Sequence, residues 1–244
     1  MADRGRGRRP GAVALAVVVI VVPAAAFAVV AAIDDPATVD TQAVRGEASQ
    51  VTPTVPPPPG CRRVIVIGDS LMDNAEPWLR AGLRDAGFTY FVDAEPSRRI
   101  PERVRAPKSG VKAARSVRAT WGEADCWMIA LGSNDLIFGG GDPATADSMI
   151  DEMLGATTPD ARVWWVNVDY HRDSRTSFDF PRATAVFNER LDARAAADPA
   201  FTVIDWYSYA EANLNWFFDP VHVDRTGSIA RAEQAVAALP RSGP

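Results

Sequence analysis

The chain has 244 residues, of which 47% are hydrophobic and 23% charged, which is ordinary for a globular protein and enough for one domain with a real core. Its net charge is −5, and because four arginines and one aspartate give residues 1–33 a charge of +3, the remainder carries −8. Such an acidic domain is a poor candidate for binding nucleic acid, which depends on neutralising phosphates.

The first 33 residues are typical of a membrane anchor. Residues 11–33 carry no charge, and their 23 residues suffice to cross a bilayer core of roughly 30 Å at about 1.5 Å per residue. The arginines of the tail 1–10 precede this run, so the positive-inside rule places the tail in the cytoplasm and the rest outside a single-pass cell-membrane protein. A cleaved signal peptide ending near Ala31 and Ala32, with a secreted product, is the alternative. The run is longer than the roughly 7–15 residues of a signal core, which favours the anchor.

Residues 34–60 are polar, aperiodic and end in a proline-rich stretch. They cannot bury a core, which predicts an extended, semi-rigid linker that holds the following domain away from the membrane. Residues 61–244 contain no internal repeat, and we expect them to form a single domain.

Apolar runs and helical patterns alternate along this domain. Buried strands are predicted at 64–67, 88–92, 127–131, 162–168 and 201–205. Helices are predicted at 74–85, 111–120, 143–154, 181–197 and 225–239, with an irregular basic loop at 94–110. This alternation predicts an α/β fold, a three-layer α/β/α sandwich with a five-stranded parallel sheet in the flavodoxin-like order.

The only two cysteines are Cys61 and Cys126. They lie seven residues before Gly68 and six before Gly132, so neighbouring first and third strands would place them side by side. Export permits oxidation, which predicts a disulfide, with two free buried thiols as the alternative. Two cysteines without a nearby histidine supply too few ligands for a metal site.

The first strand, four consecutive β-branched residues at 64–67, is followed by Gly68, Asp69 and Ser70. Glycine permits a sharp turn, and Ser70 then lies just past the carboxyl end of a strand, where open α/β sheets bind ligands. A serine there can be a nucleophile if a base takes its proton. The alternative is that Asp69 and Ser70 only cap the following helix.

A candidate base lies just before the last helix. In Asp219-Pro220-Val221-His222 the acid can reach the imidazole Nδ1–H, which fixes the tautomer and stabilises the imidazolium. Gly132-Ser133-Asn134-Asp135 follows the third strand, and an asparagine amide there can donate to a developing oxyanion. Each stretch alone is also good turn chemistry, but all three fall at the same edge of the predicted sheet.

In their order and spacing, Gly68–Leu71, Gly132–Asp135 and Asp219–His222 resemble blocks I, III and V of the SGNH (GDSL) hydrolase family. The resemblance covers about residues 62–239. It implies the SGNH hydrolase fold, ester or acyl chemistry, and neither a metal nor a cofactor.

The resemblance also implies a role for individual residues. Ser70 would be the nucleophile, His222 the base and Asp219 its partner. The Asn134 amide and the backbone N–H of Ser70 would donate to the oxyanion.

The block II glycine, whose backbone N–H completes the oxyanion hole in the family, has no counterpart here. Residues 92–99 contain no glycine, and Ser97 or Arg98 stands nearest its place. We assign Ser97 to the oxyanion hole, because a backbone donor needs no particular side chain, although a residue other than glycine restricts the backbone. Gly-x-Ser-x-Gly is absent, since Met72 replaces its second glycine, which argues against an α/β-hydrolase.

Three further groups each allow two interpretations. His171 follows the fourth strand and either lines a substrate pocket or lies on a surface loop. Four arginines either meet an anionic substrate or form a solvated basic loop: Arg98, Arg99, Arg103 and Arg105. Aromatic residues near Asp219 stack on a sugar, pack an acyl chain or belong to the core: Trp206, Trp216, Phe217 and Phe218.

These observations predict a membrane-tethered, extracytoplasmic serine esterase or deacylase. Its substrates would be O-acyl esters of cell-envelope glycans or lipids. One alternative is an O-acyltransferase that works with a membrane acyltransferase as acyl-donor partner. The other is a non-catalytic glycan-binding module.

Overall fold

The computed structural model of the chain describes residues 61–170 and 177–240. The predicted tail, anchor and linker before residue 61 lie outside this part of the chain, as does His171, and they stay predictions. Among the described helices, none is both long and apolar enough to cross a bilayer.

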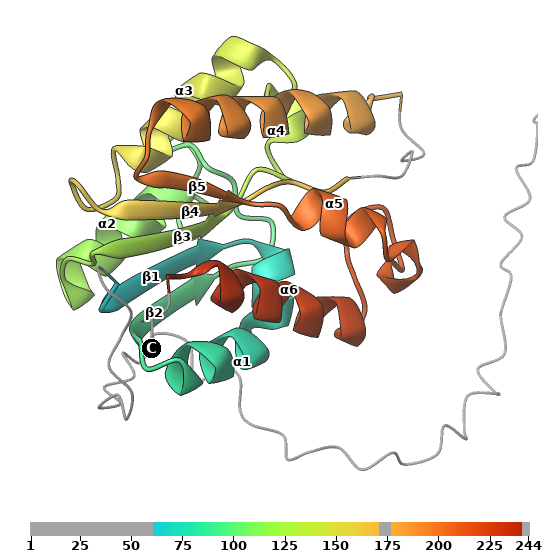
Figure 1. The fold of residues 1–244 in the computed structure, drawn as a ribbon. Coiled ribbons are helices and arrows are strands. Elements are labelled where there is room, and N and C mark those ends of the chain that lie inside the picture. The colour runs from blue at the N-terminus through green and yellow to red at the C-terminus, as the bar shows by residue number, and fades with distance from the viewer. Residues whose placement is uncertain (1–60, 171–176, 241–244) are drawn as a thin grey trace, which may run out of the picture. The chain divides into compact units, whose positions relative to one another are not determined.

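Five parallel strands form one sheet in the order β2-β1-β3-β4-β5, which confirms the predicted architecture (Figure 1). The strands are β1 (Arg63–Gly68), β2 (Thr89–Ala94), β3 (Cys126–Ala130), β4 (Arg162–Val166) and β5 (Phe201–Ile204). In register, Gly68 lies opposite both Ala94 and Ala130, so β1, β2 and β3 end together. The loops that follow these strands therefore meet at one edge of the sheet.

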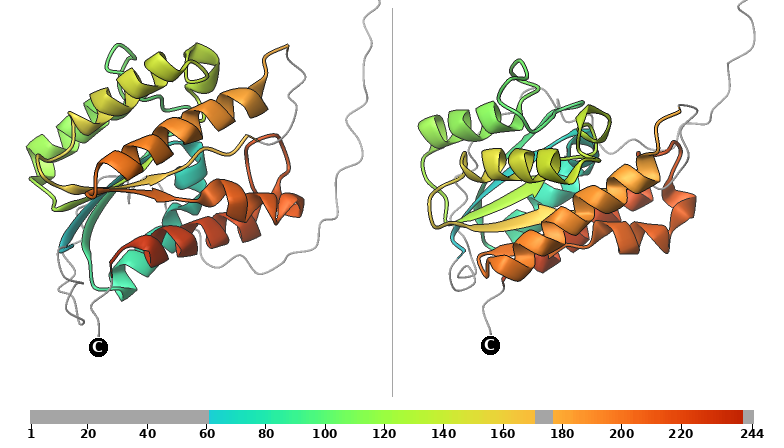
Figure 2. Two further views of the ribbon diagram at one scale, coloured as in Figure 1. Left: turned by 45° about the horizontal axis from the view of Figure 1, so that its top comes forward. Right: turned by 90° about the horizontal axis from the view of Figure 1, so that it is seen from above.

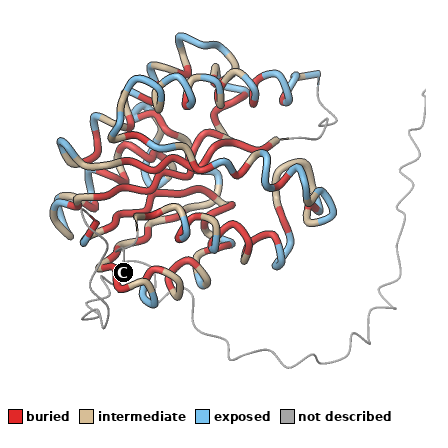
Figure 3. The backbone as a smooth tube through the Cα atoms, viewed as in Figure 1, coloured by how far each residue is buried: buried red, intermediate tan, exposed pale blue. Residues whose placement is uncertain are grey.

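Helices cover both faces of the sheet and complete the three layers (Figure 2). One face is covered by α1 (Ser70–Asp85) and α6 (Arg225–Ala238), and the other by α2 (Gly110–Trp121), α3 (Pro143–Leu154) and α4 (Phe180–Ala197). Side chains of β1 alternate between the two faces, with Val66 in the first core and Ile65 and Ile67 in the second. Because both faces are covered, the central strands β1, β3 and β4 are buried almost continuously along their length (Figure 3).

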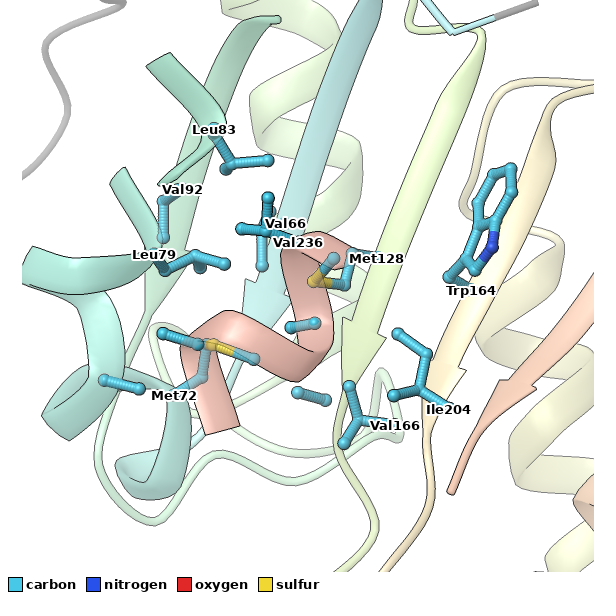
Figure 4. Close-up of a cluster of buried hydrophobic side chains, with 14 of the residues drawn as sticks. Val66, Met72, Leu79, Leu83, Val92, Met128, Trp164, Val166, Ile204 and Val236 are labelled. Atoms are coloured by element: carbon cyan, nitrogen blue, oxygen red, sulfur yellow. The ribbon is translucent and has the colours of Figure 1, made fainter. Parts of the chain in front are cut away.

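The core under α1 and α6 fixes these two helices against the sheet. Leu79 and Leu83 of α1 and Val236 of α6 pack with Val66 and Met128 of the sheet (Figure 4). Full burial of side chains of this size stabilises the fold by about 1.5–3 kcal/mol each. This core holds the first residue of α1 and the loop before α6 at the same edge of the sheet.

Two local features differ from the predicted elements. The first helix begins at Ser70 and not at residue 74, because the Asp69 side chain accepts a hydrogen bond from Leu71 N–H and caps it. Three short helices were not predicted: η1 (Leu136–Phe138), α5 (Trp206–Glu211) and η2 (Leu214–Trp216). The last two extend beyond β5 on the side where the strands end (Figure 1).

A disulfide joins Cys61 and Cys126, as predicted from the sequence. Their Cα atoms are 5.6 Å apart, and Cys126 lies opposite Val64 in the register of β1 and β3. Both residues are fully buried. The bond therefore ties the start of the first strand to the centre of the sheet.

Replacing both Cys61 and Cys126 by serine should lower the free energy of unfolding by about 4 kcal/mol. The disulfide closes a loop across a sequence separation of 65 residues, and chain-entropy arguments give a loop of that length this stabilisation. Urea unfolding with and without reductant measures it. Reductant should destabilise the wild type and leave the double variant unchanged, and equal stability of the two oxidised proteins would contradict the expectation.

Candidate active site

Ser70 occupies the first turn of α1, directly beyond the end of β1. A Cβ atom on Gly68 would come within 2.4 Å of the Met72 side chain, so the tight turn from strand to helix leaves room only for glycine. Asp69, at the N-cap, has an extended backbone and turns the chain into the helix. Ser70 is thus presented at the sheet edge at the amino end of a helix, where the helix dipole favours negative charge.

A continuous hydrogen-bond chain joins Ser70, His222 and Asp219, although 152 residues separate the serine from the histidine. The Ser70 Oγ lies 2.9 Å from His222 Nε2, and His222 Nδ1 lies 2.7 Å from Asp219 Oδ2. With the proton on Nδ1 donated to the carboxylate, Nε2 is free to accept the serine proton. The predicted nucleophile, base and acid are therefore brought together in the geometry that proton transfer requires.

Asp219 is held by the turn that carries His222. Its Oδ1 accepts hydrogen bonds from the backbone N–H groups of Val221 (2.8 Å) and His222 (2.7 Å). Partial burial by itself would raise the pKa of Asp219, but these two bonds and the imidazole together hold that pKa below its usual value. The carboxylate thus stays ionised at neutral pH and orients the imidazole.

Two of the candidate oxyanion donors belong to Ser70 itself and to Asn134, which contacts the residue before Ser70. The Ser70 N–H, at the first position of α1, has no carbonyl of its own helix to bond. The Asn134 amide nitrogen donates to Arg98 O at 3.2 Å and makes a longer contact to Asp69 Oδ2 at 3.4 Å. Asn134 in this way links the loops after β1, β2 and β3.

Gly132 begins the loop that carries Asn134. Its φ is +130°, and a Cβ there would come within 2.6 Å of Phe187 and 2.8 Å of Val168. Both the backbone conformation and the close approach of the core therefore require glycine. The turn places Asn134 over the ends of the central strands.

Ser97 has a left-handed backbone, with φ of +60°, and is exposed. This is the conformation that favours glycine, so the backbone takes the shape expected of a block II glycine although the residue is serine. The neighbouring Arg98 N–H donates to Glu95 O at 3.1 Å. Of the two residues considered for this donor, Ser97 is therefore the one whose N–H is not engaged in the turn.

Arg98 is buried and belongs to neither of the two alternatives expected for the loop arginines. Its guanidinium donates to Asp93 Oδ1 (2.7 Å) and to the backbone carbonyls of Asp93 (2.6 Å), Pro107 (3.1 Å) and Gly68 (3.3 Å). It therefore ties the loop after β2 to the ends of β1 and β2. Arg98 is thus neither a surface group that could meet an anionic substrate nor part of a solvated basic loop.

The other loop arginines differ from Arg98. Arg103 and Arg105 are exposed, as expected of a solvated basic loop. Arg99 Nε contacts Asp135 Oδ1 at 3.2 Å, and its guanidinium lies 3.6 Å from the centroid of the Phe138 ring. Arg99 thus covers one face of Phe138 and pairs with a buried carboxyl of the Asn134 loop.

Two buried carboxyls lie below the site. Asp135 accepts a hydrogen bond from Ile100 N–H at 3.0 Å, and burial raises its pKa to about 7 against the effects of that bond and of Arg99. Burial likewise raises the pKa of Asp69, opposed by Arg231, by Leu71 N–H, by His222 and by Arg98. Arg231 of α6 is itself buried, which lowers its pKa to about 10. The sequence pattern did not point to Arg231, and the only signal was an arginine among the mostly small residues 227–232.

The aromatic residues near Asp219 fall into two groups. Trp206 and Phe217 are buried, and the half-buried Trp216 lies nearly parallel to Trp206, with ring centroids 6.4 Å apart. Phe218 is 69% exposed, and its ring lies at 12° to the His222 ring with centroids 6.0 Å apart. The first three residues belong to the core and its margin, whereas Phe218 lies at the site.

No protein-family model matches the chain, and no curated protein matches its sequence. Solved structures do share its fold. The catalytic domain of peptidoglycan O-acetyltransferase A from Streptococcus pneumoniae has a TM-score of 0.58 at 16% identity, over 73% of this chain and 93% of that one. A G-D-S-L family lipolytic protein from Veillonella parvula has a TM-score of 0.59 at 16% identity, over 73% of this chain and 98% of that one. Est24, a carbohydrate acetylesterase from Sinorhizobium meliloti, has a TM-score of 0.52 at 14% identity, over 72% of this chain and 99% of that one.

Replacing Ser97 by glycine should raise the free energy of unfolding by up to about 1.5 kcal/mol. A left-handed backbone costs a residue other than glycine about 1–2 kcal/mol, and the greater freedom of glycine in the unfolded chain offsets roughly 0.5–1 of that. Ser97→Ala keeps the strain and removes only the hydroxyl, so urea unfolding should not distinguish it from the wild type. If the Ser97→Gly protein were less stable than the wild type, the backbone at Ser97 would not be strained.

Asp135 should make the fold less stable as the pH rises from about 4 to 7. In this range the folded protein keeps the Asp135 proton, because its pKa is about 7, whereas the unfolded chain has lost it above the usual value of 3.8. The free energy of unfolding then falls by up to about 1.4 kcal/mol per pH unit from this group. Asp135→Asn keeps an acceptor for Ile100 N–H and removes the titration, so the difference between the two urea-unfolding series isolates it. Parallel pH profiles would show that Asp135 titrates normally.

Proposed function

We propose that this chain, which has the fold of the SGNH (GDSL) hydrolases, is a serine esterase or deacylase acting on O-acyl esters. The observation that carries the proposal is the hydrogen-bond chain from Ser70 through His222 to Asp219. Ser70 is the nucleophile, His222 the general base and Asp219 the acid that orients it. Neither a metal nor a cofactor is needed for this chemistry.

The reaction follows from this arrangement. Ser70 Oγ attacks the ester carbonyl carbon while His222 Nε2 takes its proton. The tetrahedral intermediate collapses to an acyl-enzyme, and the imidazolium gives the proton to the departing alcohol. Water, deprotonated by the same imidazole, then attacks the acyl-enzyme, and release of the acid restores Ser70.

The negative charge of the intermediate meets the N–H groups of Ser70 and Ser97 and the Asn134 amide. A preorganised donor of this kind contributes about 10²–10³ in rate where single donors have been removed from such sites. The Arg98 bonds support this role, because they hold the loop that carries Ser97 against the ends of β1 and β2. A backbone donor in a left-handed residue can therefore replace the family glycine.

The proposed location is the outer face of the cell membrane. The apolar run 11–33 and the arginines before it favour an anchor with the domain outside, and the Cys61–Cys126 disulfide is in keeping with an oxidising compartment. O-acylated glycans or lipids of the cell envelope are the proposed substrates. Two of the structural neighbours are a peptidoglycan O-acetyltransferase and a carbohydrate acetylesterase, which supports the glycan class.

The second candidate is an O-acyltransferase, favoured by the structural likeness to a peptidoglycan O-acetyltransferase domain. In that reaction a sugar hydroxyl replaces water in the second step and is deprotonated by the same His222. It requires a membrane partner that delivers the acyl group. Incubating the chain with an acetylated glycan and an acceptor sugar separates the two, because hydrolysis releases acetate and transfer acetylates the acceptor.

Ser70→Ala should abolish labelling by a fluorophosphonate probe and lower kcat/KM for aryl acetates by at least about 1,000-fold. Ser116→Ala, on the exposed side of α2, is the matched control and should label and react like the wild type. Labelling that persists in Ser70→Ala would identify another nucleophile. A folded wild type that neither labels nor hydrolyses esters would leave the non-catalytic glycan-binding module as the better description.

A further inference from the structure

Phe218 is exposed beside the proposed base, and the turn that holds the catalytic acid also holds Phe218 in place. At 69%, it is more exposed than any other large apolar side chain in the described residues. Its backbone N–H donates to His222 O at 3.2 Å, and the adjacent Phe217 pairs with Val223 as an antiparallel bridge. The backbone of Phe218 is therefore fixed relative to that of His222, and water covers most of the ring although burial would be favourable for a side chain of this size.

The position of Phe218 decides which half of a substrate it meets. The carbonyl oxygen must point toward the N–H groups of Ser70 and Ser97 and the Asn134 amide. The alcohol oxygen must lie at His222 Nε2, because the imidazole returns its proton to that oxygen. Phe218, stacked beside His222, therefore faces the alcohol half of the ester and not its acyl chain.

The chemistry of this position suits a sugar ring. The π face of phenylalanine is negative, and one face of a pyranose presents C–H groups with partial positive charge, so the two surfaces attract and bury apolar area. The polar rim of a sugar would meet the Asp219 side chain, which is 37% exposed. An acyclic alcohol offers no such flat face.

We propose that Phe218 is the stacking platform for the sugar ring of the alcohol half, so that the substrate class is an O-acyl sugar. This inference rests on the proposed esterase function and narrows it. Phe218 then determines specificity by binding the substrate, and it takes no part in the proton transfers of the triad.

Phe138 supplies a matched control. It is also an exposed phenylalanine near the site, 51% exposed, and it lies in η1 after the Asn134 loop. One of its faces is already covered by the Arg99 guanidinium at 3.6 Å, and its ring does not stack beside His222 as that of Phe218 does. Removing it should not affect discrimination between a sugar ester and an acyclic ester.

The test compares two acetate esters in the full-length chain: glucose pentaacetate, which contains a ring, and glycerol triacetate, which does not. Phe218→Ala should lower kcat/KM for glucose pentaacetate about 5- to 10-fold, mainly through a higher KM, and change the glycerol ester by less than about 2-fold. Phe218→Trp should restore the preference. Phe138→Ala should leave the ratio between the two esters unchanged, and the rate of fluorophosphonate labelling should be the same in all these proteins.

Each other outcome overturns the inference in a recognisable way. An equal loss on both esters, with slower labelling, would mean that Phe218 supports His222 and does not bind the sugar. If Phe218→Ala left the ratio of kcat/KM between the two esters unchanged, Phe218 would not be a stacking platform, and the esterase proposal would remain intact. A wild type that hydrolyses neither ester would contradict the esterase proposal and the platform that rests on it.

Discussion

The buried Asp69 carboxylate is the point at which the parts of the site are joined. Its Oδ1 caps α1 through Leu71 N–H, and its Oδ2 lies 3.4 Å from the Asn134 amide. A carboxylate without water around it is costly, and burial raises its pKa, but the nearby charges of Arg231 and Arg98 oppose that cost. The residue before the nucleophile therefore caps the helix that carries the nucleophile and also contacts a candidate oxyanion donor.

The loop after β2 shows how a missing glycine is accommodated. Its backbone adopts the left-handed conformation at Ser97, and the next residue anchors it, because Arg98 donates to three backbone carbonyls and to Asp93. Bonds from a charged donor are worth about 1.5–3 kcal/mol each, so these bonds together exceed the roughly 1–2 kcal/mol of left-handed strain. The loop thus keeps its shape by polar contacts from a neighbouring side chain and not by the freedom of its own backbone.

The sequence predicted the features that depend on local pattern and topology. Apolar runs separated by helical patterns predicted the five strands and their order, and that order placed Cys61 beside Cys126. The sequence could not predict that Arg98 and Arg231 are buried, because the backbone carbonyls and carboxylates around them are brought together only by the fold. The early start of the first helix has a local cause instead, because the Asp69 cap decides it, whereas the apolar pattern placed the start at residue 74. The membrane anchor lies outside the described residues and stays a prediction.

Under the proposed function, the choice between hydrolysis and transfer is made on the alcohol side of the site. The acyl-enzyme and the base are the same in both reactions, and only the hydroxyl that reaches His222 differs. The side chains of His222 and Asp219 are 30% and 37% exposed, so water has access to the base unless something displaces it. A sugar lying on Phe218 would both present a hydroxyl and exclude water from that position. Occupancy of one aromatic surface, and not any change in the triad, is therefore the physical variable on which the two activities would depend.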